Sequence, residues 1–265
     1  MRLDLYLFKK GICKSRSTAQ MYIESGAVSL NGKTGLKPST DVSENDSVGI
    51  LFNPLKYVGR GGLKLEKALD DFNISVKNLI CADIGASTGG FTDCLLQNGA
   101  SKVYAIDSGS GQLAAEILND PRVVNMEKTN FRTVENKELI GSIDFAVCDV
   151  SFISLKKIAA SIFQILKEGS GAVLLIKPQF EAGKQKVGKN GIVRDKSVHI
   201  SLIYDLSAYF ENCGLSPQNL SFSPICGQKG NIEYLIYLKK SNEKSKIRNN
   251  EIENIVNNAF LTLKR

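Results

Sequence analysis

Two lysines and two acidic residues stand where they could activate a hydroxyl group. Lys177 and Asp149 each follow an apolar run that predicts a strand, while Lys64 opens a predicted helix and Glu233 begins a predicted strand. A weakly acidic hydroxyl needs nearby cations and a base, and a lysine serves as that base only when burial or another cation lowers its pKa. Taken alone, Lys64 is also compatible with a solvated helix residue, and Glu233 with an exposed strand residue.

A glycine-rich loop follows another apolar run and opens a predicted helix, which indicates a cofactor site. The loop reads Asp83-Ile84-Gly85-Ala86-Ser87-Thr88-Gly89-Gly90-Phe91-Thr92. The spacing from Gly85 to Gly90 fits the start of a phosphate-binding P-loop, but Phe91 stands where its lysine belongs. The dinucleotide fingerprint fails as well, because Ser87 occupies the position of its second glycine.

S-adenosylmethionine is the cofactor that this loop fits best. It carries no phosphate, so it needs an acidic residue and close approach of the backbone. Asp83 could meet its methionine end, and Phe91 and Thr92 would shape the pocket. Asp107 ends the next predicted strand, where a carboxylate accepts hydrogen bonds from ribose hydroxyls. Asn130, in Glu127-Lys128-Thr129-Asn130, is a candidate for the adenine contact. An ordinary strand–helix turn is the alternative.

The elements that must position these residues alternate between strand and helix over residues 62–240. This alternation predicts an α/β fold with a Rossmann-like, mostly parallel seven-stranded sheet that ends in an antiparallel hairpin. In such a sheet, ligands bind at the carboxyl edge of the strands. The predicted strands lie at 79–84, 103–106, 145–150, 172–176, 220–225 and 232–238, with helices at 91–97 and 155–167 and a hairpin turn at 227–230.

Residues 1–53 follow a different pattern and predict a small α+β domain. A short helix starts near Leu3, a second helix is N-capped by Ser15, and a strand at 28–30 precedes an Asn31-Gly32 turn. Pro54 and the glycines that follow indicate a linker at 54–61.

Basic residues of this part of the chain could contact RNA phosphates while its apolar faces stay buried. They are Arg2, Lys9, Lys10, Lys14, Arg16, Lys33, Lys37 and, in the linker, Arg60. By charge pattern alone, a solvated surface is favoured over contact with RNA.

The remaining segment, residues 241–265, is polar at first and then amphipathic. Apolar residues recur at helical spacing, so we expect a final helix; they are Ile252, Ile255, Val256, Ala259, Phe260 and Leu263. It would either dock on the main domain or bind a partner.

Composition narrows the class of protein. The formal net charge of +7 favours polyanionic partners, nucleic acid before acidic membranes. No apolar run reaches the length of a membrane span, and no signal peptide is predicted. Six cysteines without a C-x-x-C pair indicate core residues of a reducing compartment, so we expect a cytoplasmic protein. His199 is the single histidine, so no metal site is expected.

The N-terminal domain resembles the S4-type RNA-binding domain of ribosomal proteins and RNA-modifying enzymes. The resemblance implies recognition of structured RNA by shape and backbone. It rests on Arg2-Leu3-Asp4, Gly11, Ser15-Arg16, Ala19, Ile23, Gly26, Val28-Ser29-Leu30-Asn31-Gly32 and Lys37-Pro38-Ser39.

The chain from residue 1 to about 240 resembles the TlyA family. The motifs are Arg60-Gly61-Gly62-Leu63-Lys64-Leu65, Asp83–Thr92, Cys148-Asp149-Val150-Ser151-Phe152, Ile176-Lys177-Pro178-Gln179-Phe180-Glu181 and Gly230-Asn231-Ile232-Glu233. The resemblance implies an S4-type domain before an FtsJ-like Rossmann methyltransferase that methylates the ribose 2′-hydroxyl of cytidine in 16S or 23S ribosomal RNA. The substrate would be an assembled ribosomal subunit and the protein a monomer.

The resemblance also implies roles for the four charged residues. The FtsJ-like class uses a Lys-Asp-Lys-Glu tetrad, which here falls on Lys64, Asp149, Lys177 and Glu233. Lys177 would activate the hydroxyl, while the other three orient it and tune the charge. The alternatives are a non-catalytic RNA-binding or ribosome-assembly factor and, since family members are also labelled hemolysins, a protein that lyses membranes. We expect no stable membrane association.

Overall fold

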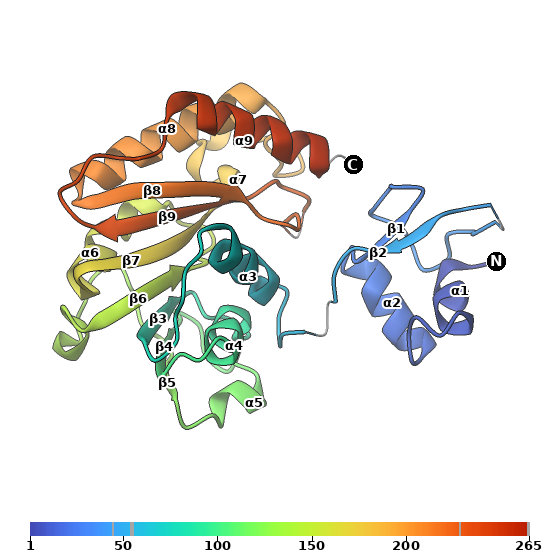
Figure 1. The fold of residues 1–265 in the computed structure, drawn as a ribbon, viewed down its shortest axis with the longest axis horizontal. Helices are drawn as coiled ribbons and strands as arrows, with labels where there is room; N and C mark the ends of the chain where they lie inside the picture. The colour runs from blue at the N-terminus through green and yellow to red at the C-terminus, as the bar shows by residue number, and fades with distance from the viewer. Residues whose placement is uncertain (44, 54–55, 228, 264–265) are drawn as a thin grey trace. The chain divides into compact units, whose positions relative to one another are not determined.

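The chain divides into two units, and the boundary between them along the sequence lies between Arg60 and Gly61 (Figure 1). The structure, a computed structural model, describes residues 1–43, 45–53, 56–227 and 229–263. Three predicted features fall in part outside these described residues: Pro54 of the linker, Gln228 of the hairpin turn and residues 264–265 of the tail.

The first unit packs two helices against a two-stranded antiparallel sheet. Ser15 caps the second helix as predicted, since its side chain accepts a hydrogen bond from the Thr18 N–H. Leu3, Leu7 and Ile23 are fully or almost fully buried in its core. The elements are α1 (Leu3–Lys9), α2 (Arg16–Glu24), β1 (Val28–Leu30) and β2 (Val48–Ile50).

The second unit is built on a seven-stranded sheet in the order β5-β4-β3-β6-β7-β9-β8. The strands from β5 to β7 are parallel, and β9 is antiparallel to both β7 and β8, which confirms the predicted fold class. The strands are β3 (Ile80–Ile84), β4 (Lys102–Ile106), β5 (Val123–Met126), β6 (Ile143–Cys148), β7 (Leu166–Ile176), β8 (Leu215–Phe222) and β9 (Tyr234–Lys240).

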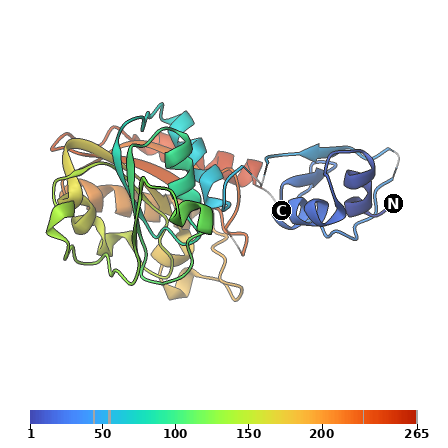
Figure 2. The ribbon, with the colours of Figure 1, turned by 90° about the horizontal axis from the view of Figure 1, so that it is seen from below.

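Helices cover this sheet, and those of the C-terminal half share one apolar core with it. Ile162 of α6, Leu206 of α8 and Val256 of α9 belong to the same buried cluster as β6 and β7, and α3 and α4 pack against each other (Figure 2). Among the described residues, no helix is both long and apolar enough to cross a membrane. The helices are α3 (Gly61–Asp71), α4 (Gly90–Gln97), α5 (Ala115–Leu118), α6 (Ala159–Ile165), α7 (Pro178–Glu181), α8 (Lys196–Asn212) and α9 (Asn249–Thr262), with 3-10 turns η1 (Lys137–Leu139), η2 (Leu155–Lys157) and η3 (Lys184–Lys186).

The helix predicted at 155–167 and the strand predicted at 172–176 have different ends in the structure. The helix predicted at 155–167 is a 3-10 turn followed by α6, and it ends at Ile165 because Leu166 already pairs with Ile143 in the sheet. Gly169, which has a φ of +75°, therefore lies within β7, opposite a register shift.

The connection between the last two strands is also longer than predicted. β8 ends at Phe222, because the Ser223 hydroxyl bonds to the backbone of Ile225 and turns the chain away. β9 starts at Tyr234, so Glu233 precedes the strand and does not begin it.

The C-terminal helix α9 docks on the second unit, as the first of the two predicted alternatives states. Ile252, Val256 and Ala259 are buried, and the helix contacts both α8 and β8 (Figure 1).

Replacing Ile252 with alanine should lower the free energy of unfolding by about 2–4 kcal/mol, since it removes a fully packed side chain from the core. Urea unfolding of the full chain measures this, and Glu253→Ala, on the exposed face of α9, is the matched control. Equal stability of the two variants would contradict the docked position of α9.

Candidate functional site

The sheet brings the four predicted charged side chains together at one edge. Asp149 and Lys177 directly follow the parallel strands β6 and β7, so both lie at the carboxyl edge. Glu233 lies at the same edge because β9 runs antiparallel to β7. Lys64 reaches it from the first turn of α3. This is where a doubly wound sheet binds its ligands.

These four side chains form a continuous series of ion pairs with alternating charge. Lys64 Nζ lies 2.7 Å from Glu233 Oε2 and 3.8 Å from Asp149 Oδ2. Lys177 Nζ lies 2.6 Å from Asp149 Oδ1. Because each lysine has an acidic partner, their charges are compensated although Lys64, Lys177 and Glu233 are buried.

The chain leaves room for this series at Gly227. A Cβ added there would overlap Oε1 of Glu233. A side chain at position 227 would therefore displace the carboxylate that holds Lys64.

The glycine loop packs directly on the tetrad. Gly85 has a φ of +86°, and a Cβ added to it would lie 2.8 Å from the carbonyl oxygen of Asp149. The Asp149 N–H donates to the carbonyl of Ile84, one residue before the glycine. Only glycine fits both the conformation and the space at this position.

Asp83 is buried beneath the loop with one carboxylate oxygen unused. Its Oδ2 accepts a hydrogen bond of 2.7 Å from the Thr92 hydroxyl, and among the described residues no donor reaches its Oδ1. Burial raises the pKa of Asp83 to about 7, and the nearby charge of Asp149 adds to this effect. A buried acid of this kind is suited to receive a cation.

Beside the loop lies a small depression that contains only part of the predicted cofactor set. Ser87 and Asp107 line it, and the Asp107 carboxylate accepts hydrogen bonds from the backbone N–H groups of Ser87 and Gly109, at 2.8 and 2.7 Å. Of its other lining residues, Glu127 belongs to the segment predicted for the adenine contact, and the rest were not predicted. Ala105 of β4 and Asn125 of β5 lie in strands, and the others lie in loops: Ala86, Gly109, Ser110, Gln112 and Leu113.

The other residues predicted for the cofactor lie around this depression. Gly89, Gly90, Phe91 and Thr92 are buried at the start of α4 or just before it, and Thr88 is exposed. Asn130 does not line the depression: it is exposed, and its side chain accepts a hydrogen bond from the Arg132 N–H within its own loop.

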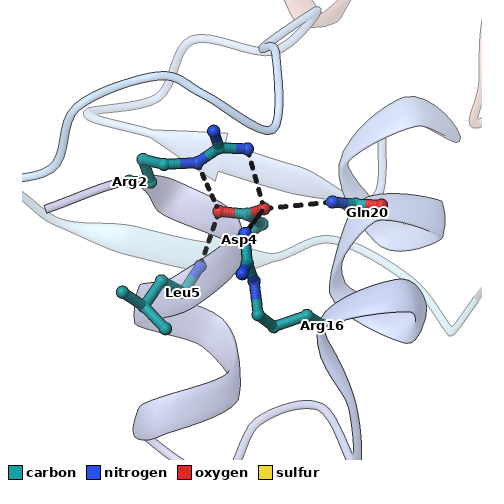
Figure 3. A network of polar contacts seen from close by, with 5 residues as sticks. All are labelled: Arg2, Asp4, Leu5, Arg16 and Gln20. Atoms are coloured by element: carbon teal, nitrogen blue, oxygen red, sulfur yellow. Dashed lines mark hydrogen bonds and ion pairs between the residues drawn. The ribbon is translucent and has the colours of Figure 1, made fainter.

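In the first unit, two of the predicted RNA-binding arginines share one buried carboxylate (Figure 3). Arg2 reaches both oxygens of Asp4 at 3.1 and 3.0 Å, and Arg16 reaches Oδ2 at 3.0 Å. Gln20 donates to the same oxygen. Asp4 is fully buried, while the arginine side chains are about half exposed. Hydrogen bonds from Arg2 hold the pKa of Asp4 well below its usual range.

The other predicted RNA-binding residues are spread over the surface of this unit, apart from Arg60, which is half-buried. The exposed ones are Lys9, Lys10, Lys14, Lys33 and Lys37.

Asp4→Asn should destabilise the first unit by about 2 kcal/mol at neutral pH, because it removes charged hydrogen bonds from a buried site. Since the pKa of Asp4 is lowered on folding, its contribution is present above about pH 4 and is lost as the pH falls below that value. Hydrogen exchange of the α1 and α2 amides measures this, with the exposed Asp41→Asn as control. Unchanged protection in Asp4→Asn would contradict a stabilising role.

Two family models together match most of the chain. The model described as FtsJ-like methyltransferase matches residues 57–240, and the model described as S4 domain matches residues 1–48. The two matches correspond to the two units of the structure.

Two relatives match this chain over most of its length and of their own. The 16S/23S rRNA (cytidine-2′-O)-methyltransferase TlyA of Mycobacterium tuberculosis is 37% identical, over 92% of this chain and 91% of its own length. The 23S rRNA (cytidine-2′-O)-methyltransferase TlyA of Campylobacter jejuni is 35% identical, over 91% of this chain and 100% of its own.

A solved structure of a Streptococcus thermophilus protein described as a hemolysin is 42% identical, with a TM-score of 0.78. The match covers 100% of this chain and 97% of that one. With the family models, the full-length relatives and the tetrad at the sheet edge, the chain belongs to the TlyA branch of the FtsJ-like methyltransferases, S-adenosylmethionine-dependent enzymes that here carry an S4 domain in front.

Proposed function

We propose that this protein methylates the ribose 2′-hydroxyl of a cytidine in ribosomal RNA, using S-adenosylmethionine. The observation that carries the proposal is the series of ion pairs joining Lys64, Asp149, Lys177 and Glu233 at the ligand-binding edge of the sheet. The names of the relatives support the cytidine and the ribosomal RNA, and they differ in whether 16S RNA is included. We further propose that the protein acts in the cytoplasm, as a monomer, on an assembled ribosomal subunit.

The residues around the glycine loop fit the cofactor. Asp83 offers a buried oxygen without a partner, which suits the amino group of the methionine part. Gly85 lets the backbone approach closely, and Asp107 lines the adjacent depression, where ribose hydroxyls would bind. When bound, S-adenosylmethionine supplies an electrophilic methyl group on its sulfonium.

The affinity for S-adenosylmethionine should rise with pH and level off above about pH 7. A bound ammonium favours ionised Asp83, whose pKa in the free protein is about 7, so binding below that pH must release a proton. We expect about a tenfold loss of affinity per pH unit below the pKa. Calorimetric titration from about pH 5.5 to about pH 8 measures this.

Asp83→Asn should bind more weakly and lose this pH dependence, whereas Asp70→Asn, an exposed acid on α3, should behave as the wild type. Affinity that is flat across this range in the wild type would exclude Asp83 as the partner of the ammonium.

The four residues of the tetrad have different roles in proton transfer. In its neutral form Lys177 accepts the proton of the substrate hydroxyl, and Asp149, 2.6 Å from the Lys177 nitrogen, holds that nitrogen in place. Lys64 keeps Asp149 in place from the other side, and Glu233 keeps Lys64. Removing Asp149 leaves the buried Lys177 without its ion-pair partner, and removing Lys64 does the same for the buried Glu233.

The first unit supplies the docking surface for RNA. Asp4 holds Arg2 and Arg16 side by side with half of each side chain exposed, which suits contact with backbone phosphates. The exposed lysines, together with Arg60, add positive charge that attracts the RNA without reading its sequence. They are Lys9, Lys10, Lys14, Lys33 and Lys37.

The test is transfer of a labelled methyl group to purified small and large ribosomal subunits and to the corresponding free RNAs, with the modified nucleotide mapped by mass spectrometry. Lys177→Ala should lower turnover by about 10²–10⁴-fold while leaving the affinity for S-adenosylmethionine unchanged. Lys157→Ala, an exposed lysine of η2, is the matched control.

Methylation that survives in Lys177→Ala would remove this lysine from the role of base. Absence of transfer to any subunit or RNA, together with no calorimetric heat on addition of S-adenosylmethionine, would instead favour a non-catalytic RNA-binding factor.

A further inference from the structure

A serine outside the tetrad contacts the lysine proposed as base. Lys177 Nζ donates a hydrogen bond of 2.8 Å to Ser151 Oγ. Ser151 lies two residues after Asp149 and is exposed, whereas Lys177 is buried. The series of ion pairs therefore ends in a neutral hydroxyl on the accessible side.

The two partners of Lys177 hold it in different ways. The ion pair with Asp149 fixes where the nitrogen lies, since attraction between charges has little directional preference. The hydrogen bond to Ser151 is directional and fixes how the nitrogen is rotated about its bond to Cε. Among the described residues, Ser151 is the hydrogen-bond partner of the Lys177 nitrogen.

This rotation decides whether the nitrogen can act as a base. A neutral amine has two N–H groups and one lone pair in tetrahedral positions. With one N–H directed at Ser151 and the other attracted to Asp149, the lone pair occupies the third position. Without Ser151, the amine could turn and present an N–H there, and a nitrogen that presents an N–H cannot accept a proton.

The segment that carries the serine contacts the segment that carries the lysine. The residue after the serine, Phe152, has a φ of +63°, an uncommon conformation for a bulky residue, and is 91% exposed. Its ring packs on Phe180 of α7, with ring centres 5.1 Å apart. This contact joins the segment after β6, which carries Ser151, to the segment after β7, which carries Lys177.

We propose that Ser151 is a positioning residue that turns the Lys177 nitrogen so that its lone pair meets the substrate hydroxyl. In the step it assists, the O–H bond of the substrate breaks and an N–H bond forms on Lys177, while the bonding electrons stay on the oxygen. Ser151 neither gains nor loses a proton. The inference rests on the proposed function.

Ser151→Ala should lower kcat about 10-fold, the effect of losing one hydrogen bond to a charged or reacting group. Its KM for RNA and its affinity for S-adenosylmethionine should stay within about twofold of the wild type. Ser151→Thr, which keeps the hydroxyl, should restore kcat to within about threefold of the wild-type value. Ser170→Ala, near the opposite end of β7, is the matched control and should behave as the wild type.

A second measurement does not depend on activity. In protein labelled with ¹⁵N and ¹³C in lysine, the side-chain signal of Lys177 is identified by its loss in Lys177→Arg. It should shift in Ser151→Ala and stay unchanged in Ser170→Ala.

The role of Ser151 is refuted if Ser151→Ala keeps the wild-type kcat, if Ser151→Thr is as slow as Ser151→Ala, or if the lysine signal does not move. A wild-type protein that methylates no ribosomal RNA refutes the proposed function separately, and the lysine signal then still reports whether Ser151 holds Lys177.

Discussion

The site depends on one carboxylate placed between two ammonium groups. Asp149 lies 2.6 Å from Lys177 and 3.8 Å from Lys64. Without Asp149, the two buried lysines would repel each other, and removing their charges from water would be costly. The strand order, the contact of α3 with β9 and the antiparallel direction of β9 together bring the four side chains into this arrangement.

The first unit uses the same principle for a different purpose. Asp4 is fully buried and receives two guanidinium groups, Arg2 and Arg16, that remain half exposed. In the second unit the carboxylate of Asp149 lies between two buried ammonium groups, whereas here the carboxylate holds two planar cations at a surface. In both units, an acid lets positive charges lie closer together than their repulsion would otherwise permit.

Patterns along the chain predicted the sheet and the carboxyl ends of β4 and β7, because apolar runs followed by a charged residue mark the carboxyl edge of a parallel sheet. They did not locate β5, a short edge strand without a fully buried residue. They also gave no role to Ser151, whose partner lies 26 residues away. Asn130 was predicted as the adenine contact, but its side chain accepts a hydrogen bond within its own loop and does not line the depression. Contacts between distant side chains leave no periodic signal, so they had to come from the structure.

The tight seat of Gly85 against the Asp149 carbonyl has an energetic consequence. The glycine loop and the backbone of Asp149 are in close contact here, so a shift of the loop must also move Asp149. If a bound cofactor stabilises Asp149 in the position that RNA binding requires, bound RNA must raise the affinity for the cofactor by the same factor. This follows because coupling between two binding sites is reciprocal.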